Sequence, residues 1–369
     1  MARTLRSDKI LFWAALILVC TSVVMVVSAS AATEPMARVL LRQLGFAAVG
    51  LVAMFAAMRT NYHHWQRPSL IWTAVALSVL GLLAVFVFKE RNGAHRWITF
   101  LGQSVQPSEF AKITAVIFGA AVLQRRMHRI DDVKYSLLPV AIVTGILAFL
   151  IVEEPDLGTS LVVVMAVMSM VFVAGLNWRY LFGFVLLMLP AVTYYIVTHP
   201  FRVNRMLAFL WPDSSSNLKE GWQLLQSEIA LGSGGVLGLG LGGSIQKRFF
   251  LPEANNDFIL AVIGEELGLI GTTALLICFA VIAWRGLRAS LLAPDRFGTL
   301  VGIGLSMMVA MQAFLNMTVV TGMAPTKGIP LPLVSAGGTS LLINLIALGI
   351  LLNISQQRSP TAAATVNTP

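Results

Sequence analysis

Two opposite charges stand three residues apart at the start of a long apolar stretch. Glu109 and Lys112 belong to residues 106–112, where Pro107 suits the first turn of a helix. Side chains at i and i+3 share one helix face and can neutralise each other. The pattern predicts either an ion pair inside a packed protein or charged groups that line a substrate cavity.

Three carboxylates within four residues form a second polar group. Glu153, Glu154 and Asp156 surround Pro155 between two apolar stretches. Carboxylates this close can raise one another's pKa or share a cation. Asp156 is equally well placed to cap the following helix. The residues leave open whether Glu154 and Asp156 bind a substrate or form a solvated turn.

Basic side chains form a third group. Arg96 precedes Trp97, and a guanidinium can hold a phosphate through two hydrogen bonds. The same pair can also anchor the chain at a membrane interface. Farther along, Arg205, Lys247 and Arg248 lie in a long segment between apolar stretches. These cations suit an anionic headgroup, or simply adhesion to a membrane.

The long segment also contains a predicted amphipathic helix at residues 221–231. Trp222, Leu225 and Ile229 fall near one face of it, with Gln226 beside them. A helix with this pattern lies in the plane of the membrane interface.

One carboxylate, Asp257, stands immediately before a further apolar stretch. At the expected start of a helix it can cap free N–H groups, or it can do chemistry at the membrane surface. On an ideal helix, Glu265 and Glu266 would lie about 80° and 180° from Asp257. The three carboxylates therefore do not share a face, and small residues on the Asp257 face leave room for a ligand or for close helix packing.

A proline-rich stretch, residues 325–332, cannot form a helix. It carries Lys327, and Ser335 follows it before the last apolar stretch. Non-helical backbone at membrane depth must line a cavity or be buried in protein. The stretch therefore indicates an outward-facing polar pocket between helices.

These polar groups are exceptional because the chain is strongly apolar. Of its 369 residues, 57% are hydrophobic and 12% are charged. Soluble proteins carry about 25% charged residues, so a soluble enzyme and a disordered chain are both excluded. We expect an all-α polytopic membrane protein with one domain over residues 1–358 and a disordered tail at 359–369. Its ten expected membrane-spanning helices are 10–33, 36–58, 68–88, 108–124, 135–152, 157–178, 180–201, 257–284, 297–323 and 334–355.

The distribution of basic residues orients this bundle. An even number of spans places both termini on one side, whose loops and helix ends hold fourteen Lys and Arg against six in the short loops and helix ends of the other side. Basic residues concentrate on the cytoplasmic side, so we expect both termini in the cytoplasm. Residues 199–256, between the seventh and eighth spans, then form a long extracytoplasmic loop that includes the interfacial helix. The net charge of +9 is thereby explained without a nucleic-acid partner.

Seven glycines within residues 232–243 include a G-x-G-x-x-G pattern. That pattern binds dinucleotides only between a strand and a helix, so we interpret it here as a mobile, closely packed loop. No Ser-His-Asp arrangement or His cluster is recognisable. The residues alone therefore indicate an enzyme or a transporter for a large, anionic, lipid-linked substrate.

The chain resembles the shape, elongation, division and sporulation (SEDS) family over nearly its whole length. The matching motifs are residues 96–98, 106–112, 155–159, 230–235, 251–268 and 327–340. Residues 246–247 and 325–328 are similar to the branch of the family that acts in cell division, whereas Asn255, Asn256 and Ala336 depart from its usual pattern.

This resemblance implies a peptidoglycan glycosyltransferase that polymerises lipid II, an undecaprenyl-diphosphate-linked disaccharide pentapeptide. The reaction would occur at the outer face of the bacterial cytoplasmic membrane. The family's essential aspartate falls on Asp257, which would act as general base on the acceptor hydroxyl. We expect substrate contacts from Arg96, Glu109, Lys112, Glu154, Asp156, Arg205, Gln226, Lys247, Arg248, Lys327 and Ser335.

Partners follow from the same resemblance. They are a class B penicillin-binding protein with transpeptidase activity, other division proteins and membrane lipids. The resemblance implies a divalent cation, Mg²⁺ or Mn²⁺, whose ligands are not recognisable in the sequence, and no organic cofactor. Three alternatives stay open: a lipid II flippase, a polymerase of the elongation or sporulation type, and a non-catalytic scaffold. Carboxylates concentrated on the outer half favour catalysis.

Overall fold

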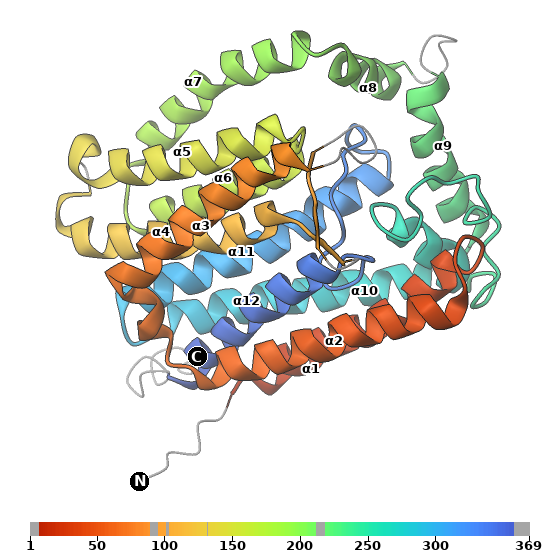
Figure 1. Ribbon diagram of the computed structural model, residues 1–369, viewed down its shortest axis with the longest axis horizontal. Helices are drawn as coiled ribbons and strands as arrows, with labels where there is room; N and C mark the ends of the chain where they lie inside the picture. Colours follow the sequence, from red (N-terminus) through yellow and green to blue (C-terminus); the bar gives the residue numbers. More distant parts are fainter. Residues whose placement is uncertain (1–6, 89–94, 101–102, 131, 212–217, 358–369) are drawn as a thin grey trace, which may run out of the picture.

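The protein is a helical bundle in which short irregular segments gather at one end (Figure 1). The computed structural model describes residues 7–88, 95–100, 103–130, 132–211 and 218–357. Its long helices are α1 (Lys9–Ser30), α2 (Met36–Arg59), α3 (Pro68–Ala84), α4 (Pro107–Arg126), α5 (Leu138–Glu153), α6 (Leu157–Val173), α7 (Trp178–Val197), α10 (Ile259–Leu291), α11 (Arg296–Val320) and α12 (Gly338–Gln356). The tail predicted at 359–369 lies outside the described residues.

The described helices agree with a polytopic membrane protein. Eight are long and apolar enough to cross a bilayer, and the apolar helix α6 is shorter. Helix α4 contains the buried Glu109 and Lys112 together with Arg125 and Arg126 in its last turn. Each of the ten predicted spans corresponds to one of the long helices.

Several predicted helix boundaries are wrong. The sixth span was expected to end at residue 178 and the eighth at residue 284, but α6 ends at Val173 and α10 continues to Leu291. The seventh span was expected to continue to residue 201, but α7 ends at Val197 and Pro200 opens a new helix, α8 (Pro200–Leu210). Proline favours the first turn of a helix because it lacks an N–H group. The last helix was expected from residue 334, but it begins at Gly338 because the preceding residues form a turn.

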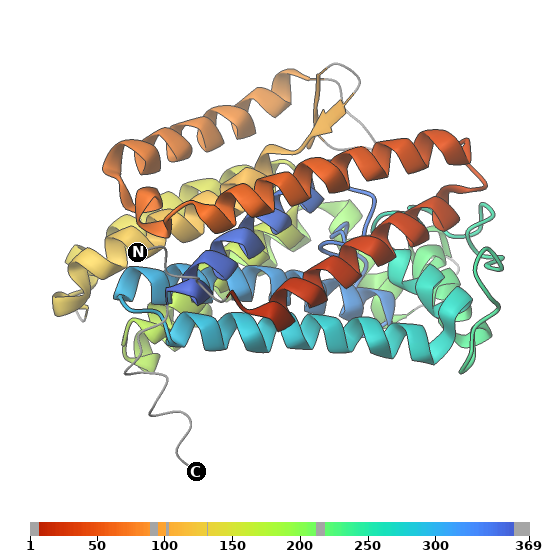
Figure 2. The same ribbon diagram turned by 90° about the horizontal axis from the view of Figure 1, so that it is seen from below.

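The two ends of the chain's helical part lie side by side. Asp8 caps α1 through the N–H groups of Ile10 and Leu11, and its own N–H donates to Ser355 Oγ over 3.1 Å. Arg285, near the end of α10, pairs with the Asp8 carboxylate at 2.6 Å. At the opposite end of the bundle lie the α5–α6 turn, the start of α10 and the connection between α11 and α12 (Figures 1 and 2).

Helix α10 is broken at Gly268, whose φ of 64° and ψ of −162° are not helical. The glycine-rich loop supplies hydrogen-bond donors at the break, because its Leu239 and Gly240 N–H groups donate to the carbonyls of Glu265 and Glu266. A Cβ atom on Gly268 would lie 2.4 Å from the nitrogen of Gly238. The prediction of a closely packed loop is confirmed, and the close backbone approach explains its glycines.

The long connection between α7 and α10 carries two helices. Helix α8 is followed by α9 (Leu218–Ser233), which confirms the helix predicted at 221–231. Trp222, Leu225 and Ile229 are exposed, whereas Gln226 is buried. The exposed apolar face fits the predicted interfacial helix.

Candidate active site

A large cavity occupies the end of the bundle where the irregular segments meet. Its volume is about 1150 Å³. It is lined by the α5–α6 turn, the ends of α7 and α8, and residues 252–258, 325–330 and 336–340. A two-stranded antiparallel hairpin, β1 (Ile98–Phe100) and β2 (Gln103–Val105), follows Arg96 and connects to α4.

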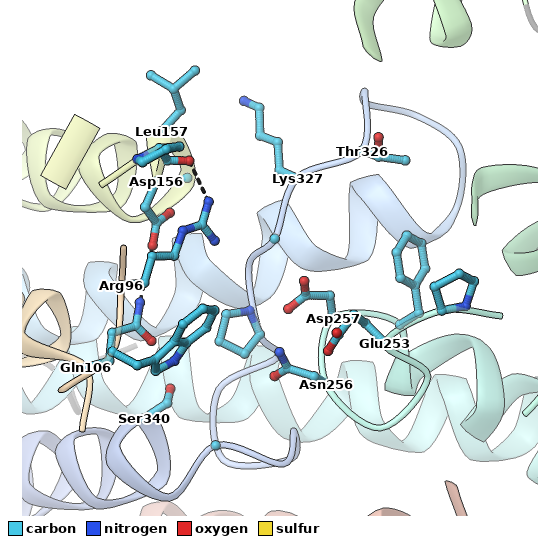
Figure 3. A pocket seen from close by; sticks show the side chains of 18 of the residues that line it. Arg96, Gln106, Asp156, Leu157, Glu253, Asn256, Asp257, Thr326, Lys327 and Ser340 are labelled. Atoms are coloured by element: carbon cyan, nitrogen blue, oxygen red, sulfur yellow. Dashed lines mark hydrogen bonds between the residues drawn. The ribbon is translucent and has the colours of Figure 1, made fainter. Parts of the chain in front are cut away.

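Asp257 is half-buried and reaches into this cavity (Figure 3). Of the two alternatives for Asp257, helix capping is wrong, because Phe258 is the cap residue of α10 and no side chain bonds the helix start. Burial, together with the nearby charge of Glu253, raises the pKa of Asp257 to about 7, although Arg96 and Arg205 oppose the shift. At neutral pH this carboxyl group can therefore both accept and release a proton.

Arg96 stands across the cavity from Asp257 (Figure 3). Its guanidinium donates to two backbone carbonyls, those of Glu154 at 3.1 Å and Pro155. A Cβ atom placed on Gly328 would lie 3.1 Å from both Arg96 Nη1 and Asp257 Oδ2. Gly328 therefore occupies the space between the cation and the carboxylate, and its missing side chain keeps that space open.

The α5–α6 turn supplies several cavity residues and one buried carboxyl group. Asp156 caps α6, as its capping interpretation predicted, by accepting from the Thr159 N–H at 3.0 Å, and it also lines the cavity. Glu154 is fully buried, and neither of its side-chain oxygens has a hydrogen-bond partner among the described residues. Burial and the neighbouring Asp156 raise the pKa of Glu154 to about 9, so Glu154 is uncharged at neutral pH.

The connection between α11 and α12 carries another cavity cation. Lys327 lines the cavity, and burial lowers the pKa of its ammonium group. Arg205 of α8 reaches the same segment, where its Nη1 donates to the Thr326 carbonyl at 3.2 Å. Arg96, Lys327 and Arg205 thus bring positive charge to the cavity that contains Asp257.

Several residues predicted to contact substrate lie elsewhere. Lys247 is buried against Glu266, with 2.6 Å between Nζ and Oε1, and it also donates to Ser28. Lys112 is buried against Glu109 at 2.9 Å, which agrees with the ion-pair interpretation and not with a cavity lining. A charge already neutralised inside the protein is not available to a substrate.

The remaining corrections concern four residues that the cavity lining does not include: Glu154, Gln226, Arg248 and Ser335. Gln226 is buried within α9, and Arg248 is exposed outside the cavity. Ser335 Oγ is occupied by the backbone, because it accepts from the Leu331 N–H and donates to the Asn256 carbonyl. Of the twelve predicted site residues, the cavity therefore brings together Asp257, Arg96, Asp156, Arg205 and Lys327.

The sequence analysis missed two buried amides on α11. Gln312 accepts from Lys112 Nζ and donates to the Pro330 carbonyl at 3.0 Å. Asn316, one turn later, donates to the carbonyls of Asp257 and Ile329. The missed signal was two polar side chains at i and i+4 in an otherwise apolar helix.

The small residues expected on the Asp257 face serve close packing. A Cβ atom on Gly264 would lie 2.4 Å from Leu231 of α9, and one on Gly234 would lie 1.9 Å from the Gly264 carbonyl oxygen. The space beside Gly264 is therefore filled by α9 and the glycine-rich loop, which leave no room there for a ligand.

Comparisons with known proteins identify the class to which this fold and site belong. The sequence profile of the cell cycle protein family FtsW/RodA/SpoVE matches residues 8–360. The chain belongs to this family.

Individual relatives agree with that assignment. The chain is 39% identical over 364 residues to a probable peptidoglycan glycosyltransferase FtsW of Geobacter metallireducens, with 96% of each chain covered. It is 40% identical to stage V sporulation protein E of Bacillus subtilis, with 86% of this chain and 87% of that protein covered.

Solved structures agree as well. A chain from a peptidoglycan synthase complex that coordinates polymerization and crosslinking superposes with a TM-score of 0.78 and 30% identity, covering 96% of this chain and 99% of that one. The rod shape determining protein RodA of Thermus thermophilus superposes with a TM-score of 0.71 and 27% identity, covering 96% and 98%.

Proposed function

We propose that this protein is a peptidoglycan glycosyltransferase that polymerises lipid II in septal wall synthesis during cell division. One observation carries the proposal: Asp257, with a pKa of about 7, shares a large cavity with Arg96, Arg205 and Lys327. A base and several cations in one cavity suit a reaction in which a hydroxyl loses a proton while a diphosphate departs. Family membership and the names of the relatives support the same activity.

Asp257 is the general base in this mechanism. Its carboxylate accepts the proton of the 4-hydroxyl of the acceptor N-acetylglucosamine while that oxygen attacks C1 of the donor N-acetylmuramic acid. The new bond joins O4 to C1, the bond between C1 and the diphosphate oxygen breaks, and the configuration at C1 inverts. A positioned general base contributes about 10²–10⁴-fold to such a step.

The cations stabilise the leaving group. The lipid diphosphate departs with the electron pair of the broken bond, so negative charge grows on its oxygen atoms and is best stabilised by preorganised positive groups. Arg96 suits this role because its observed hydrogen bonds go to neutral carbonyls. Its charge is therefore not cancelled by those contacts. Lys327 and Arg205 add positive charge to the same cavity, whose lining also includes Arg42 and Arg202.

A divalent cation would need ligands from the substrate. In the part of the chain that the structure describes, no three His, Cys, Asp or Glu side chains are grouped to hold a metal ion. Mg²⁺ is often held by one or two carboxylates plus substrate phosphates and water. Glu253, the carboxylate beside Asp257 in the cavity, would be the protein ligand in such a shared site, where the cation would neutralise diphosphate charge.

The proposed topology has ten spans, cytoplasmic termini and an outward-facing cavity in the bacterial inner membrane. The basic bias of the loops on the N-terminal side supports it. The contact between Asp8 and Ser355 supports a common side for both chain ends. The cavity lies at the other end, where an extracytoplasmic substrate would be met.

A class B penicillin-binding protein is the proposed partner and would supply crosslinking. The superposition with a chain from a complex that coordinates polymerization and crosslinking supports this proposal. We expect the contact on α10 and α11, with other division proteins and membrane lipids as further neighbours.

The test is polymerisation by the purified protein with its partner. Labelled lipid II is supplied, and glycan products are separated on a gel. We expect polymer from the wild type and none from Asp257→Asn. Asp132→Asn is the matched control, because Asp132 is an exposed cap residue at the other end of the bundle and asparagine caps equally well.

Two outcomes would count against the proposal. Full polymerisation by a folded, partner-bound Asp257→Asn protein would remove the base assignment. Lipid II flipping in liposomes without any polymer would instead support the flippase alternative.

A further inference from the structure

Three successive backbone carbonyls hold the segment that carries Asp257. The Asn255 carbonyl accepts from the Ala336 N–H at 2.9 Å, and the Asn256 carbonyl accepts from Ser335 Oγ at 2.6 Å. The Asp257 carbonyl accepts from Asn316 Nδ2 at 2.7 Å. Because α10 starts only at Ile259, these bonds, rather than a helix, fix the backbone at the general base.

Asn316 makes the contact that joins both walls of the site. The same Nδ2 atom also donates to the Ile329 carbonyl at 2.7 Å. Ile329 follows Lys327 and Gly328, so one amide group bridges the Asp257 segment and the segment that carries the cavity lysine. Asn316 is 1% exposed, so bulk solvent does not reach its amide group.

The chemistry of this contact requires an amide. Two carbonyl oxygens converge on one nitrogen, and an asparagine NH₂ group supplies two donors from a single atom. The other amide atom, Oδ1, has no partner among the described residues. This arrangement satisfies both carbonyls through a single side chain.

A second amide on α11 holds the same loop segment. Gln312, four residues earlier, donates to the Pro330 carbonyl and receives the ammonium group of Lys112. The i and i+4 positions lie one above the other on a helix. The two amides therefore grip consecutive carbonyls, those of Ile329 and Pro330, from one side of α11.

We propose that Asn316 is a positioning residue for the reaction, because it fixes the Asp257 backbone relative to the Lys327–Gly328 segment. The inference rests on the proposed function, in which Asp257 is the base. Displacement of reacting groups by about 1 Å can cost about 10²-fold in rate. Asn316 itself touches no substrate, since it lies behind the cavity wall and not in its lining.

The experiment compares Asn316→Ala with Asn353→Ala in the polymerisation assay. Asn353 is a matched control: it is buried, its Nδ2 donates to the Met58 carbonyl at 2.8 Å, and it bridges to the Tyr62 N–H at the far end of the bundle. Both variants lose one buried bridging amide. We expect similar falls in melting temperature for the two.

The two variants should differ in kcat. Asn316→Ala should lower kcat by about 10- to 100-fold and change the KM for lipid II by less than about threefold. Asn353→Ala should keep kcat close to the wild-type value at a temperature where both variants are folded. A second variant, Ser335→Ala, removes the bond to the neighbouring Asn256 carbonyl and the bond from the Leu331 N–H. It leaves the Asp257 carbonyl bonded to Asn316, so it should give a smaller loss in kcat.

Each result decides a different point. If Asn316→Ala keeps the kcat of Asn353→Ala while Asp257→Asn is inactive, the positioning role is wrong and the proposed function stands. If Asp257→Asn is fully active, the proposed function fails whatever Asn316 does. Should Asn316→Ala not fold, Asn316→Asp replaces both donors at equal size, and wild-type kcat in that variant would also overturn the inference.

Discussion

The most direct test of the site is the pH dependence of polymerisation. Asp257 must be ionised to accept a proton, and its pKa is raised to about 7. A single group with that pKa is about one-tenth ionised at pH 6 and about nine-tenths ionised at pH 8. We therefore expect kcat/KM for lipid II to rise about tenfold between pH 6 and pH 8 at constant ionic strength.

Two variants shift this acid limb in opposite directions. The nearby Glu253 raises the pKa of Asp257, so Glu253→Gln should move the limb to lower pH. Arg205 lowers that pKa, so Arg205→Met should move the limb to higher pH. Initial rates of polymer formation, measured at each pH, give the acid limb of each variant. A profile that is flat from pH 6 to pH 8, or two shifts of the same sign, would refute the reasoning.

The same pKa predicts a stability effect with a defined sign. The folded protein holds the Asp257 proton more tightly than the unfolded chain does, so ionisation of Asp257 destabilises the fold as the pH rises from about 4 to about 7. Asp257→Asn removes that cost. Its melting temperature should exceed the wild-type value at pH 8, and the advantage should shrink toward pH 5. The full cost is at most about 4 kcal/mol.

Three further predictions concern the fold and the cavity. Gly268→Ala places a Cβ atom 2.4 Å from the Gly238 nitrogen and should lower the melting temperature sharply, whereas Gly45→Ala meets nothing within 4 Å and should be neutral or slightly stabilising. Glu266→Gln leaves Lys247 buried without its counter-charge, so it should cost about 3–5 kcal/mol of unfolding free energy. Gly328→Ala inserts a methyl group 3.1 Å from Arg96 Nη1 and Asp257 Oδ2, so it should raise the KM for lipid II with little change in thermal stability.

The helices were largely predictable because hydropathy over about 20 residues measures the property that a bilayer selects. The start of α2 at Met36 and that of α6 at Leu157 agree with prediction. Errors arose where apolar residues continue past a helix end. Apolar character extends through Val334, but the turn before Gly338 is set by tertiary hydrogen bonds, which hydropathy does not record.

Local contacts in the site were also predictable. The pairing of Glu109 with Lys112 and the capping of α6 by Asp156 both depend on residues three positions apart. Asn316 depends on a different kind of contact, because its partners Asp257 and Ile329 are 59 and 13 residues away. Nothing in the spacing of an asparagine on an apolar helix indicates which loop carbonyls will meet it.

The location of counter-charges explains which predicted cations reach the site. Lys247 looked as suitable for a diphosphate as Lys327, because both are lysines in non-helical segments of an apolar chain. Lys247, however, meets Glu266 on α10 and is neutralised inside the protein. For Lys327 the described residues provide no ion pair, and burial lowers the pKa of its ammonium group.

A buried cation without a carboxylate partner costs folding free energy unless an anion arrives to compensate it. Lys327 is partly buried and bears part of that cost, and so does Arg96, whose guanidinium donates only to carbonyls. The negative charge of a bound diphosphate would compensate the positive charges of both residues. We therefore interpret the unneutralised cations of the cavity, and not basic residues in general, as the part of the charge pattern that belongs to substrate recognition.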